Sequence, residues 1–453
     1  MRTSPLIALL ALSLTPTWAC GDDPEKAASD TLADTLDTAD GADSEDAADV
    51  ADGDDAVEAD TRDVSSPDTS DDGTAVQVLY DDEVQMVLGF SGNIDVDVPD
   101  GVVSLAVSVI GEPANYYGLA SWVGPDQFQL VKPGWTGTSE GQQGLCVSCN
   151  NRISLSESVF AALAPNNPAA RVSAGRHTFS LFGYKPPTVV SGAGSCGDGI
   201  CHNADQYNCT RDCRSSASGG LVRVVVHAKI AASGVLPETG VLDLNLHFTG
   251  AQGLTAEKAR TDADFQAILE SMRTIYAQAG VTLGTLTYRD IDSAFKVIEA
   301  IDGEGNDLEA LFATSEGNPE ALNLFFVDSI AAGQFGGFGV ILGISGGIPG
   351  PPLAQGTRRS GVAIAIKPVQ GAPADIDTTM AHETGHFLGL FHTSEQAFFG
   401  PQIHDPLPDT PENDASYLMF NTGSGNKLSP SQGVVMRASP WVKQLPQAPG
   451  GAQ

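Results

Sequence analysis

The stretch from His382 to His392, His-Glu-Thr-Gly-His-Phe-Leu-Gly-Leu-Phe-His, constrains this chain more than any other feature. Residues four apart lie on one face of a helix, so His382 and His386 are expected to point ring nitrogens at one metal ion. Gly389 can take the left-handed conformation that ends a helix, which would bring His392 back as a third ligand. Glu383 lies about 100° round the helix from His382, where it would reach a water without being a ligand.

This donor set predicts Zn²⁺ with three protein ligands and an open fourth position, which distinguishes a catalytic zinc site from a structural one. Two histidines at this spacing also occur by chance in ordinary helices, but the added glycine and third histidine make chance a poor explanation. The sequence therefore predicts a zinc-dependent endopeptidase, a hydrolase of protein or peptide substrates, with Glu383 as its catalytic general base.

Residues 382–392 resemble the extended zinc signature of the metzincin metalloproteases. Residues 417–420, Tyr-Leu-Met-Phe, resemble the Met-turn of that clan, and the resemblance implies that Met419 forms an apolar floor beneath the metal. Two features differ from many members of the clan. No cysteine follows Cys213, and Asn421 stands where some members have a tyrosine after the Met-turn.

His392-Thr393, followed by Asp409-Thr410-Pro411, is most similar to the pappalysin branch of the clan. The resemblance covers residues 216–453 and implies an α/β (α+β) zinc metalloprotease domain there, with a mixed sheet and an active-site helix. Alternating strands and helices upstream of the signature agree with that architecture.

Periodicity predicts the elements of this domain. Apolar residues at helical spacing predict a helix over 261–279, with Phe265, Ile268, Leu269, Met272 and Ile275 on its buried face. The active-site helix is expected to begin near Asp377 or Thr378. Strands are expected at 221–227, 281–288, 322–327 and 361–366, a Gly- and Pro-rich loop at 333–357, and a short helix after the capping box Ser429–Gln432.

The N-terminus is typical of an exported chain. Arg2 precedes an apolar run from Leu6 to Leu14, which predicts a signal peptide over residues 1–20. The run ends at Thr17-Trp18-Ala19-Cys20, which resembles a bacterial lipobox and implies that Cys20 carries lipid and anchors the chain to a membrane. A cell-envelope lipoprotein on the outer surface is therefore expected, and ordinary cleavage of a secreted protein is the alternative.

Charge is concentrated near the N-terminus. The net charge of −34 argues against nucleic-acid binding. Residues 21–75 contain 20 acidic and 2 basic residues and almost no large apolar side chains, which predicts a disordered acidic linker. Residues 76–190 alternate apolar and polar positions, as in Ile94–Val98, which predicts an all-β sandwich-like domain. Surface binding, occlusion of the cleft and simple spacing are all open as its role.

The cysteines indicate disulfide bonds in an oxidising compartment, because six remain once Cys20 is set aside. Cys146 and Cys149 are expected to form a local disulfide. A small disulfide-rich module is expected at 191–215, where the pairing of four cysteines stays open: Cys196, Cys201, Cys209 and Cys213. Asp198, Asp205 and Asp212 in this module are candidate Ca²⁺ ligands, with simple solvation as the alternative.

A non-catalytic function is the competing hypothesis. In it, the sandwich and the disulfide-rich module bind a surface and the zinc site is vestigial. The intact Glu383 argues against this hypothesis, since a vestigial site has no need of a base.

Overall fold

The computed structural model describes residues 74–134, 149–190, 196–198, 200–202, 211–301, 305–331, 341–366, 376–396 and 402–444. The expected signal peptide, Cys20 and nearly all of the acidic linker lie outside these residues, as do Cys146, Asp205 and Cys209. Among the described helices, none is both long enough and apolar enough to span a bilayer.

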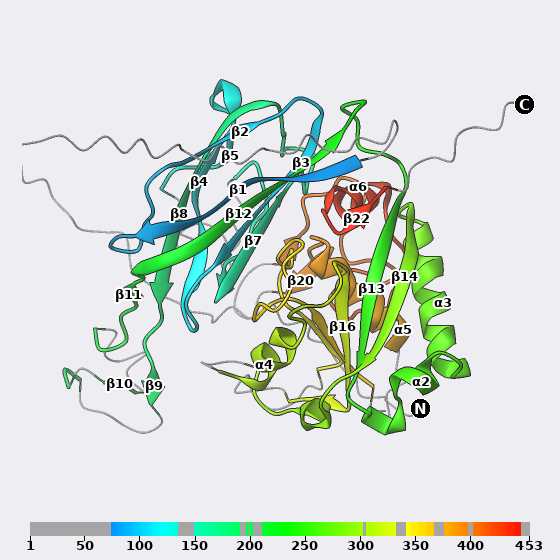
Figure 1. The fold of residues 1–453 in the computed structure, drawn as a ribbon. Helices are drawn as coiled ribbons and strands as arrows, with labels where there is room; N and C mark the ends of the chain where they lie inside the picture. The colour runs from blue at the N-terminus through cyan, green and yellow to red at the C-terminus, as the bar shows by residue number, and fades with distance from the viewer. Residues whose placement is uncertain are drawn as a thin grey trace, which may run out of the picture. The chain divides into compact units, whose positions relative to one another are not determined.

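Two antiparallel sheets, here called the N-terminal sheets, precede the region of the zinc signature (Figure 1). The first has the order β1 (Thr74–Met86), β12 (Gly220–Ala231), β3 (Val102–Ile110), β7 (Val159–Ala164). The second has the order β11 (Ser216–Ala217), β8 (Gly175–Lys185), β4 (Tyr116–Val123), β5 (Gln129–Val131), with β2 (Ile94–Val98) beside β8 and β6 (Ser156–Glu157) beside β4.

One apolar core lies between the N-terminal sheets. In β2, Ile94, Val96 and Val98 are buried while Asp95 and Asp97 are exposed, as period-two alternation requires of a strand with one buried face. Large side chains from both sheets join them: Tyr117, Trp122, Phe160 and Phe179.

The strand predicted at 221–227 forms, but as part of β12 it pairs with β1 and β3 and not with the mixed sheet. Residues 216–231 were expected in the C-terminal domain, and that expectation is wrong for both β11 and β12. The physical reason is that the alternating buried valines of β12, Val222, Val224 and Val226, fit the face of any sheet. Local pattern specifies a strand and leaves its partner undetermined.

The mixed sheet carries the order β14 (Val281–Asp290), β13 (Gly240–Phe248), β16 (Leu322–Val327), β19 (Val362–Ala365), β18 (Gly343–Ser345), with β22 (Val442–Lys443) beside β13. The first four strands are parallel, and β18 and β22 are antiparallel to their neighbours. Three predicted strands are confirmed. The central strand β13 was not predicted, and β18 lies inside the expected loop at 333–357.

Helices cover both faces of the mixed sheet: α2 (Ala256–Ala259), α3 (Ala263–Ala277), α4 (Asp307–Ala313), α5 (Ile376–Phe387) and α6 (Pro430–Ala438). Leu322, Leu324 and Phe326 of β16 pack in one cluster with α3 and α5, whereas Phe325 and Val327 pack with α4. The strand is therefore apolar on both faces, as expected of a parallel strand covered twice. The predicted capping box starts α6, with Ser429 and Gln432 bonding reciprocally.

The remaining described elements are short: η1 (Pro125–Gln127), η3 (Ala251–Gly253), η4 (Ser293–Lys296), β9 (Val189–Val190), β10 (Cys201–His202), β15 (Val297–Ile298), β17 (Ser329–Ile330), β20 (Ser394–Gln396) and β21 (Gln402–His404).

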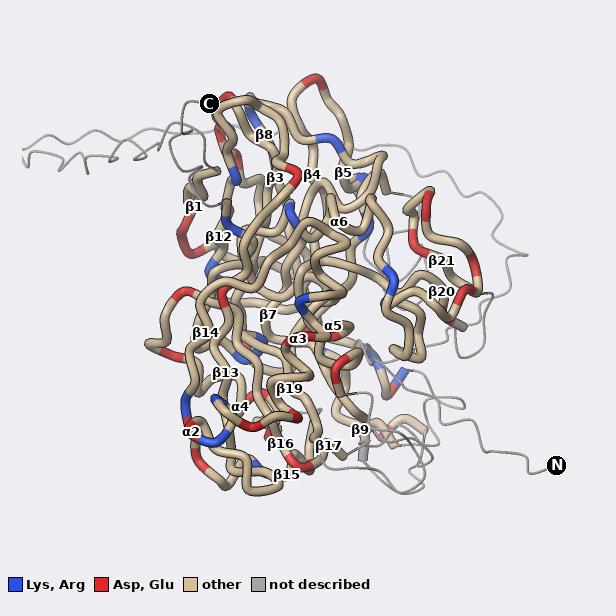
Figure 2. The backbone as a smooth tube through the Cα atoms, turned by 90° about the vertical axis from the view of Figure 1, so that its right-hand side faces the viewer, with Lys and Arg blue, Asp and Glu red and all other residues tan. Residues whose placement is uncertain are grey.

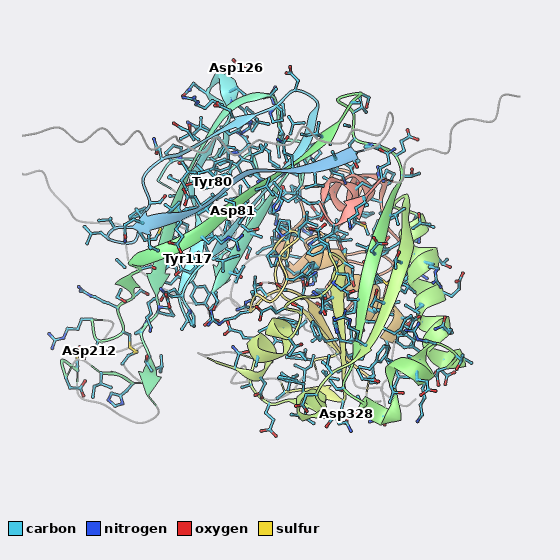
Figure 3. The ribbon with its side chains drawn as sticks, in the orientation of Figure 1. Tyr80, Asp81, Tyr117, Asp126, Asp212 and Asp328 are labelled. Atoms are coloured by element: carbon cyan, nitrogen blue, oxygen red, sulfur yellow. A yellow bond between two sulfur atoms is a disulfide. The ribbon has the colours of Figure 1, made fainter. Side chains whose placement is uncertain are left out.

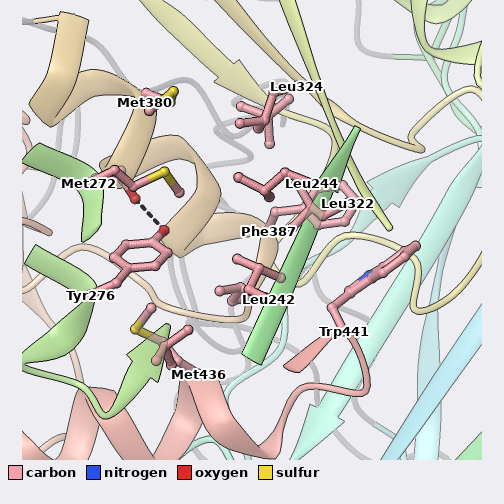
Figure 4. Close-up of a cluster of buried hydrophobic side chains, with 14 of the residues drawn as sticks. Leu242, Leu244, Met272, Tyr276, Leu322, Leu324, Met380, Phe387, Met436 and Trp441 are labelled. Carbon is pink, nitrogen blue, oxygen red and sulfur yellow. Dashed lines mark hydrogen bonds between the residues drawn. The ribbon is translucent and has the colours of Figure 1, made fainter. Parts of the chain in front are cut away.

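Helix α3 packs against α5 and holds it in position. The Tyr276 hydroxyl donates to the Ala381 carbonyl at 2.8 Å within a cluster that includes Met272 and Met380 (Figure 4). In the first turn of α5, Asp377 accepts a hydrogen bond from the Ser271 hydroxyl at 2.8 Å. The helix that bears the signature is therefore held by apolar packing and by two hydrogen bonds in its first half.

The N-terminal sheets also contact the C-terminal part of the chain directly. Buried Lys229 of β12 donates to the carbonyls of Arg437, Ser439 and Val442, which follow or end α6. Ser104 of β3 donates to the Ala438 carbonyl at 2.6 Å. Helix ends leave carbonyls without partners inside the helix, and here the N-terminal sheets supply the donors.

Disulfide bonding follows the predicted cysteines as far as the structure describes them. Cys201 pairs with Cys213 (Figure 3), and Cys149 and Cys196 are also disulfide-bonded. In the same module Asp198 accepts from the Ile200 N–H at 2.9 Å and Asp212 accepts from the Gly197 N–H. The described residues of this module contain no group of three ligands suited to a metal, while Asp205 lies outside them.

Acidic and basic residues are both spread along the described chain (Figure 2). An exposed example is the pair between Arg223 of β12 and Asp81 of β1, at 2.7 Å. Such exposed pairs contribute little to stability. Apolar packing therefore dominates the fold.

We expect Leu324→Ala to lower the free energy of unfolding by about 2–5 kcal/mol, because Leu324 is fully buried and the substitution leaves a cavity. Leu221→Ala is the matched control, since this strand leucine is 51% exposed and should cost less than about 0.5 kcal/mol. Chemical denaturation of both variants measures the difference. Equal losses would contradict the core assignment.

We expect His247 to make the fold acid-sensitive. Burial lowers the pKa of His247 to about 4, although its hydrogen bond to Asn323 raises it in part. Between pH 6.5 and 4 the unfolded chain binds a proton that the folded chain excludes, so stability falls as pH falls, by up to roughly 3 kcal/mol from this group. His247→Gln should flatten that slope in denaturation measured across the pH range without metal. An unchanged slope would contradict the prediction.

Candidate metal site

Helix α5 and the turn after it bring the three histidines of the signature together. His382 and His386 lie one turn apart on α5, and their ring centroids are 4.6 Å apart. Gly389 has φ +110°, so it takes the left-handed region that was predicted for it. The Leu390 N–H donates back to the Gly385 carbonyl at 3.0 Å, which closes the turn. The chain then returns His392 to within 4.7 Å of the His386 ring centroid.

Hydrogen bonds at the Nδ1 atoms fix the ring orientations of the two histidines on α5. His382 Nδ1 lies 2.6 Å from the Leu418 carbonyl oxygen, and His386 Nδ1 lies 2.7 Å from the Leu390 carbonyl oxygen. A carbonyl can only accept, so both Nδ1 atoms carry the proton. Burial lowers the pKa of His382 to about 3 and that of His386 well below its usual value, so both rings are neutral at pH 7. Each Nε2 therefore presents a lone pair.

The inward nitrogens converge as metal ligands would. The ligand atoms of His382, His386 and His392 all lie within 4.8 Å of one another, and the Nε2 atoms of His386 and His392 are 3.2 Å apart. Two zinc-bound nitrogens in a tetrahedral site are separated by about 3.3 Å, given Zn–N bonds near 2.0–2.1 Å. His382 Nε2 is buried without a hydrogen-bond partner. A cation among the three lone pairs would satisfy all of them, and neutral imidazoles favour Zn²⁺.

His392 is held by a carboxylate. Its Nδ1 donates to Glu395 Oε2 at 2.8 Å. Burial raises the pKa of Glu395, but the hydrogen bond from His392 and the charge of Arg152 outweigh it, and the net shift is downward. Glu395 is therefore ionised at neutral pH. Sequence analysis did not identify Glu395 or Arg152, because no local pattern links Arg152 to the signature.

Glu383 lies in a tight apolar setting beside the histidines. It is 2% exposed, and the Ser345 backbone N–H donates to its carboxylate. Burial raises the pKa of Glu383 to about 8, while that hydrogen bond lowers it in part. Gly343 makes room for the side chain, because a Cβ there would lie 2.5 Å from Glu383 Cγ and 2.9 Å from Thr379 Cγ2. Ser345, which donates to the carboxylate, and Gly343, which leaves room for it, both belong to β18, the strand that sequence analysis missed.

Met419 is fully buried and packs against α5. A Cβ added at Gly385 would lie 2.9 Å from Met419 Sδ, so the glycine between the two helix histidines admits the sulfur. The Phe420 N–H donates to the Tyr417 carbonyl at 3.1 Å, which makes a tight turn of the segment expected to be a Met-turn. The same segment supplies the Leu418 carbonyl to His382.

No family model matches the chain. It is similar to extracellular metalloprotease 1 of Coccidioides posadasii, with 29% identity over 108 residues, which are 24% of this chain and 37% of that protein. It is also similar to an extracellular metalloprotease of Pyricularia oryzae, with 26% identity over 196 residues, 42% of this chain and 64% of that protein. The chain thus spans less than two thirds of either relative. These relatives point to a metalloprotease.

Two solved structures share a weak likeness. Metalloproteinase-II from Bacteroides fragilis has 13% identity and a TM-score of 0.28, covering 48% of this chain and 63% of that chain. Archaemetzincin from Methanopyrus kandleri has 13% identity and a TM-score of 0.26, covering 45% of this chain and 98% of that chain. Likenesses this low carry no weight here, so the case for the site depends on its own geometry.

We expect the full chain to bind one equivalent of zinc through the histidine cluster. His386→Ala should weaken binding by more than about 100-fold, beyond what the loss of an outer hydrogen-bond partner causes. Competition with a chromophoric chelator measures the affinity. His247→Gln is the control, because that buried histidine belongs to no group of three metal ligands among the residues that the structure describes. Unchanged affinity in His386→Ala would refute the assignment.

Proposed function

We propose that this chain is a zinc-dependent endopeptidase of the metzincin type, closest to the pappalysin branch. The observation that carries the proposal is the inward convergence of three buried imidazoles beside the buried Glu383 side chain. Three protein ligands leave a coordination position for substrate, which suits catalysis. Similarity to extracellular metalloproteases supports the same activity.

In this proposal His382, His386 and His392 would hold Zn²⁺, and the ion would supply a Lewis acid able to polarise a peptide carbonyl and to lower the pKa of water. Glu383 acts in its ionised form, which a bound Zn²⁺ would favour against the burial that raises the pKa of this carboxyl to about 8 in the metal-free site. The carboxylate would accept the proton of the attacking water and pass it to the leaving amine. The Ser345 N–H keeps one carboxylate oxygen oriented during that transfer. Met419 forms the apolar floor of the site.

The edge of the mixed sheet supports a peptide substrate. Strand β18 ends the order of the described strands and pairs antiparallel with β19 on one side. An extended peptide can add to such an edge through backbone hydrogen bonds. Because Ser345 of β18 contacts Glu383, a peptide added there would run past the base.

Location and the other domains belong to the same proposal. We take the chain to be exported and tethered through a lipidated Cys20 by the acidic linker, with release as a secreted protein as the alternative. The sandwich-like domain then begins near residue 76, and the disulfide-rich module follows it. A surface-binding lipoprotein with a vestigial site is the competing function, and the buried, oriented Glu383 weighs against it.

The test is cleavage of a diverse peptide library by the full chain, with and without a chelator. Glu383→Gln should lower the cleavage rate by roughly 100- to 10,000-fold, the usual contribution of a general base, and keep zinc bound. Gly343→Ala should also impair cleavage more than zinc binding, because its Cβ would displace Glu383.

Glu257→Gln on the exposed face of α2 is the matched control and should cleave as the parent does. Undiminished cleavage by the Glu383→Gln protein would refute the role of the base. No cleavage by the zinc-loaded parent would favour the surface-binding alternative.

A further inference from the structure

The three histidines differ in what holds them. His382 and His386 donate to backbone carbonyls, whose positions follow from the helix and the turn at Leu418. His392 instead donates to a side chain, Glu395. A side-chain acceptor has rotational freedom that a backbone carbonyl lacks. The orientation of His392 therefore depends on what fixes the Glu395 carboxylate.

Arg152 forms an ion pair with this carboxylate. The Arg152 guanidinium Nη2 lies 3.8 Å from Glu395 Oε1, on the oxygen that His392 does not use. Its Nη1 donates to the His404 carbonyl at 2.9 Å, and its Cζ lies 4.3 Å from the centre of the Phe391 ring. Arg152 thus contacts the residue before the third histidine and both strands of the β20–β21 hairpin after it.

Arg152 belongs to the segment between the N-terminal strands β5 and β6, far from the signature in sequence. Its backbone is clamped by the Asn166 side chain, which accepts from the Arg152 N–H and donates to the Arg152 carbonyl. Asn167 donates in turn to Asn166 at 2.8 Å. All three side chains are buried. The backbone from which the guanidinium extends is therefore held in place independently of the histidine cluster.

A buried ion pair alone indicates little, because such pairs also serve packing. The chain contains a comparison in the pair Arg359–Glu157, 3.4 Å apart and more deeply buried, which also joins the N-terminal sheets to the C-terminal part. In this pair Arg359 donates both to the Glu157 carboxylate and, at 3.2 Å, to the Glu157 backbone carbonyl. Glu395 differs because its second oxygen accepts from a ligand histidine.

A carboxylate that accepts a hydrogen bond from a metal-bound histidine fixes the orientation of the ring and makes the ring a stronger electron-pair donor to the metal. We propose that Glu395 and Arg152 are positioning residues of the zinc site, so that the segment around Arg152 completes a site whose ligands all lie on the C-terminal part. The inference rests on the proposed function for the identity of the metal. It also implies that the C-terminal part without the N-terminal sheets would have a weakened site.

The experiment measures zinc affinity of the full-length chain by chelator competition and the visible absorption of its Co²⁺ form. Glu395→Ala should weaken zinc binding by roughly 10- to 100-fold, and Glu395→Gln by less, because an acceptor oxygen remains. Arg152→Met keeps apolar contact with Phe391 but removes the charge, and should fall between the parent and Glu395→Ala. Both Glu395→Ala and Arg152→Met should alter the Co²⁺ spectrum.

Glu157→Gln is the matched control, since it breaks the comparison pair and should leave zinc affinity and the Co²⁺ spectrum unchanged. Parent-like affinity and spectrum in both Glu395 variants would overturn the inference, and so would an equal loss in Glu157→Gln. If Glu395→Ala does not fold, Glu395→Gln decides by the same criteria.

Failure of the proposed function has a different signature. A parent chain that binds zinc and cleaves no peptide would refute the peptidase while these affinities still decide the inference. A parent chain that binds no zinc would overturn both.

Discussion

Three imidazole lone pairs face one another inside the protein. Because they repel one another, each ring must be held in this orientation by a hydrogen bond at its other nitrogen. The Nδ1 hydrogen bonds of His382, His386 and His392 do this, to Leu418, Leu390 and Glu395 respectively. Each bond fixes a tautomer as well as an orientation, because the acceptor is an oxygen. A cation at the centre would accept all three lone pairs as ligands. The convergence of the rings, which is unfavourable without metal, would then favour metal binding.

The elements around the site supply those outer contacts. The positive φ of Gly389 lets the chain turn so that Leu390 and His392 return to α5. The turn at 417–420 presents a carbonyl to one histidine and a methionine sulfur to the helix beside it. Tyr276 of α3 holds α5 through its hydrogen bond to the Ala381 carbonyl. A packing change near α5 would consequently also change the metal site.

Much of this could be predicted from sequence because it is local. The signature predicts α5 and its turn, helical periodicity predicts α3, and the capping box predicts the start of α6. Pairing is not local: alternation identified β12 as a strand but could not choose its sheet. Strand β13 was missed although it alternates, since its inward polar residues Asn245 and His247 are buried. The role of Arg152 could not be predicted for the same reason as the partners of β12, because only the folded chain brings Arg152 to Glu395.

The central claim is that zinc is held by three imidazoles with a position left for substrate. Zinc K-edge X-ray absorption of the zinc-loaded full chain tests it most directly. The account predicts nitrogen or oxygen ligands at about 2.0–2.1 Å with scattering from three imidazole rings and no sulfur. A sulfur shell near 2.3 Å, or fewer than three imidazoles, would contradict it.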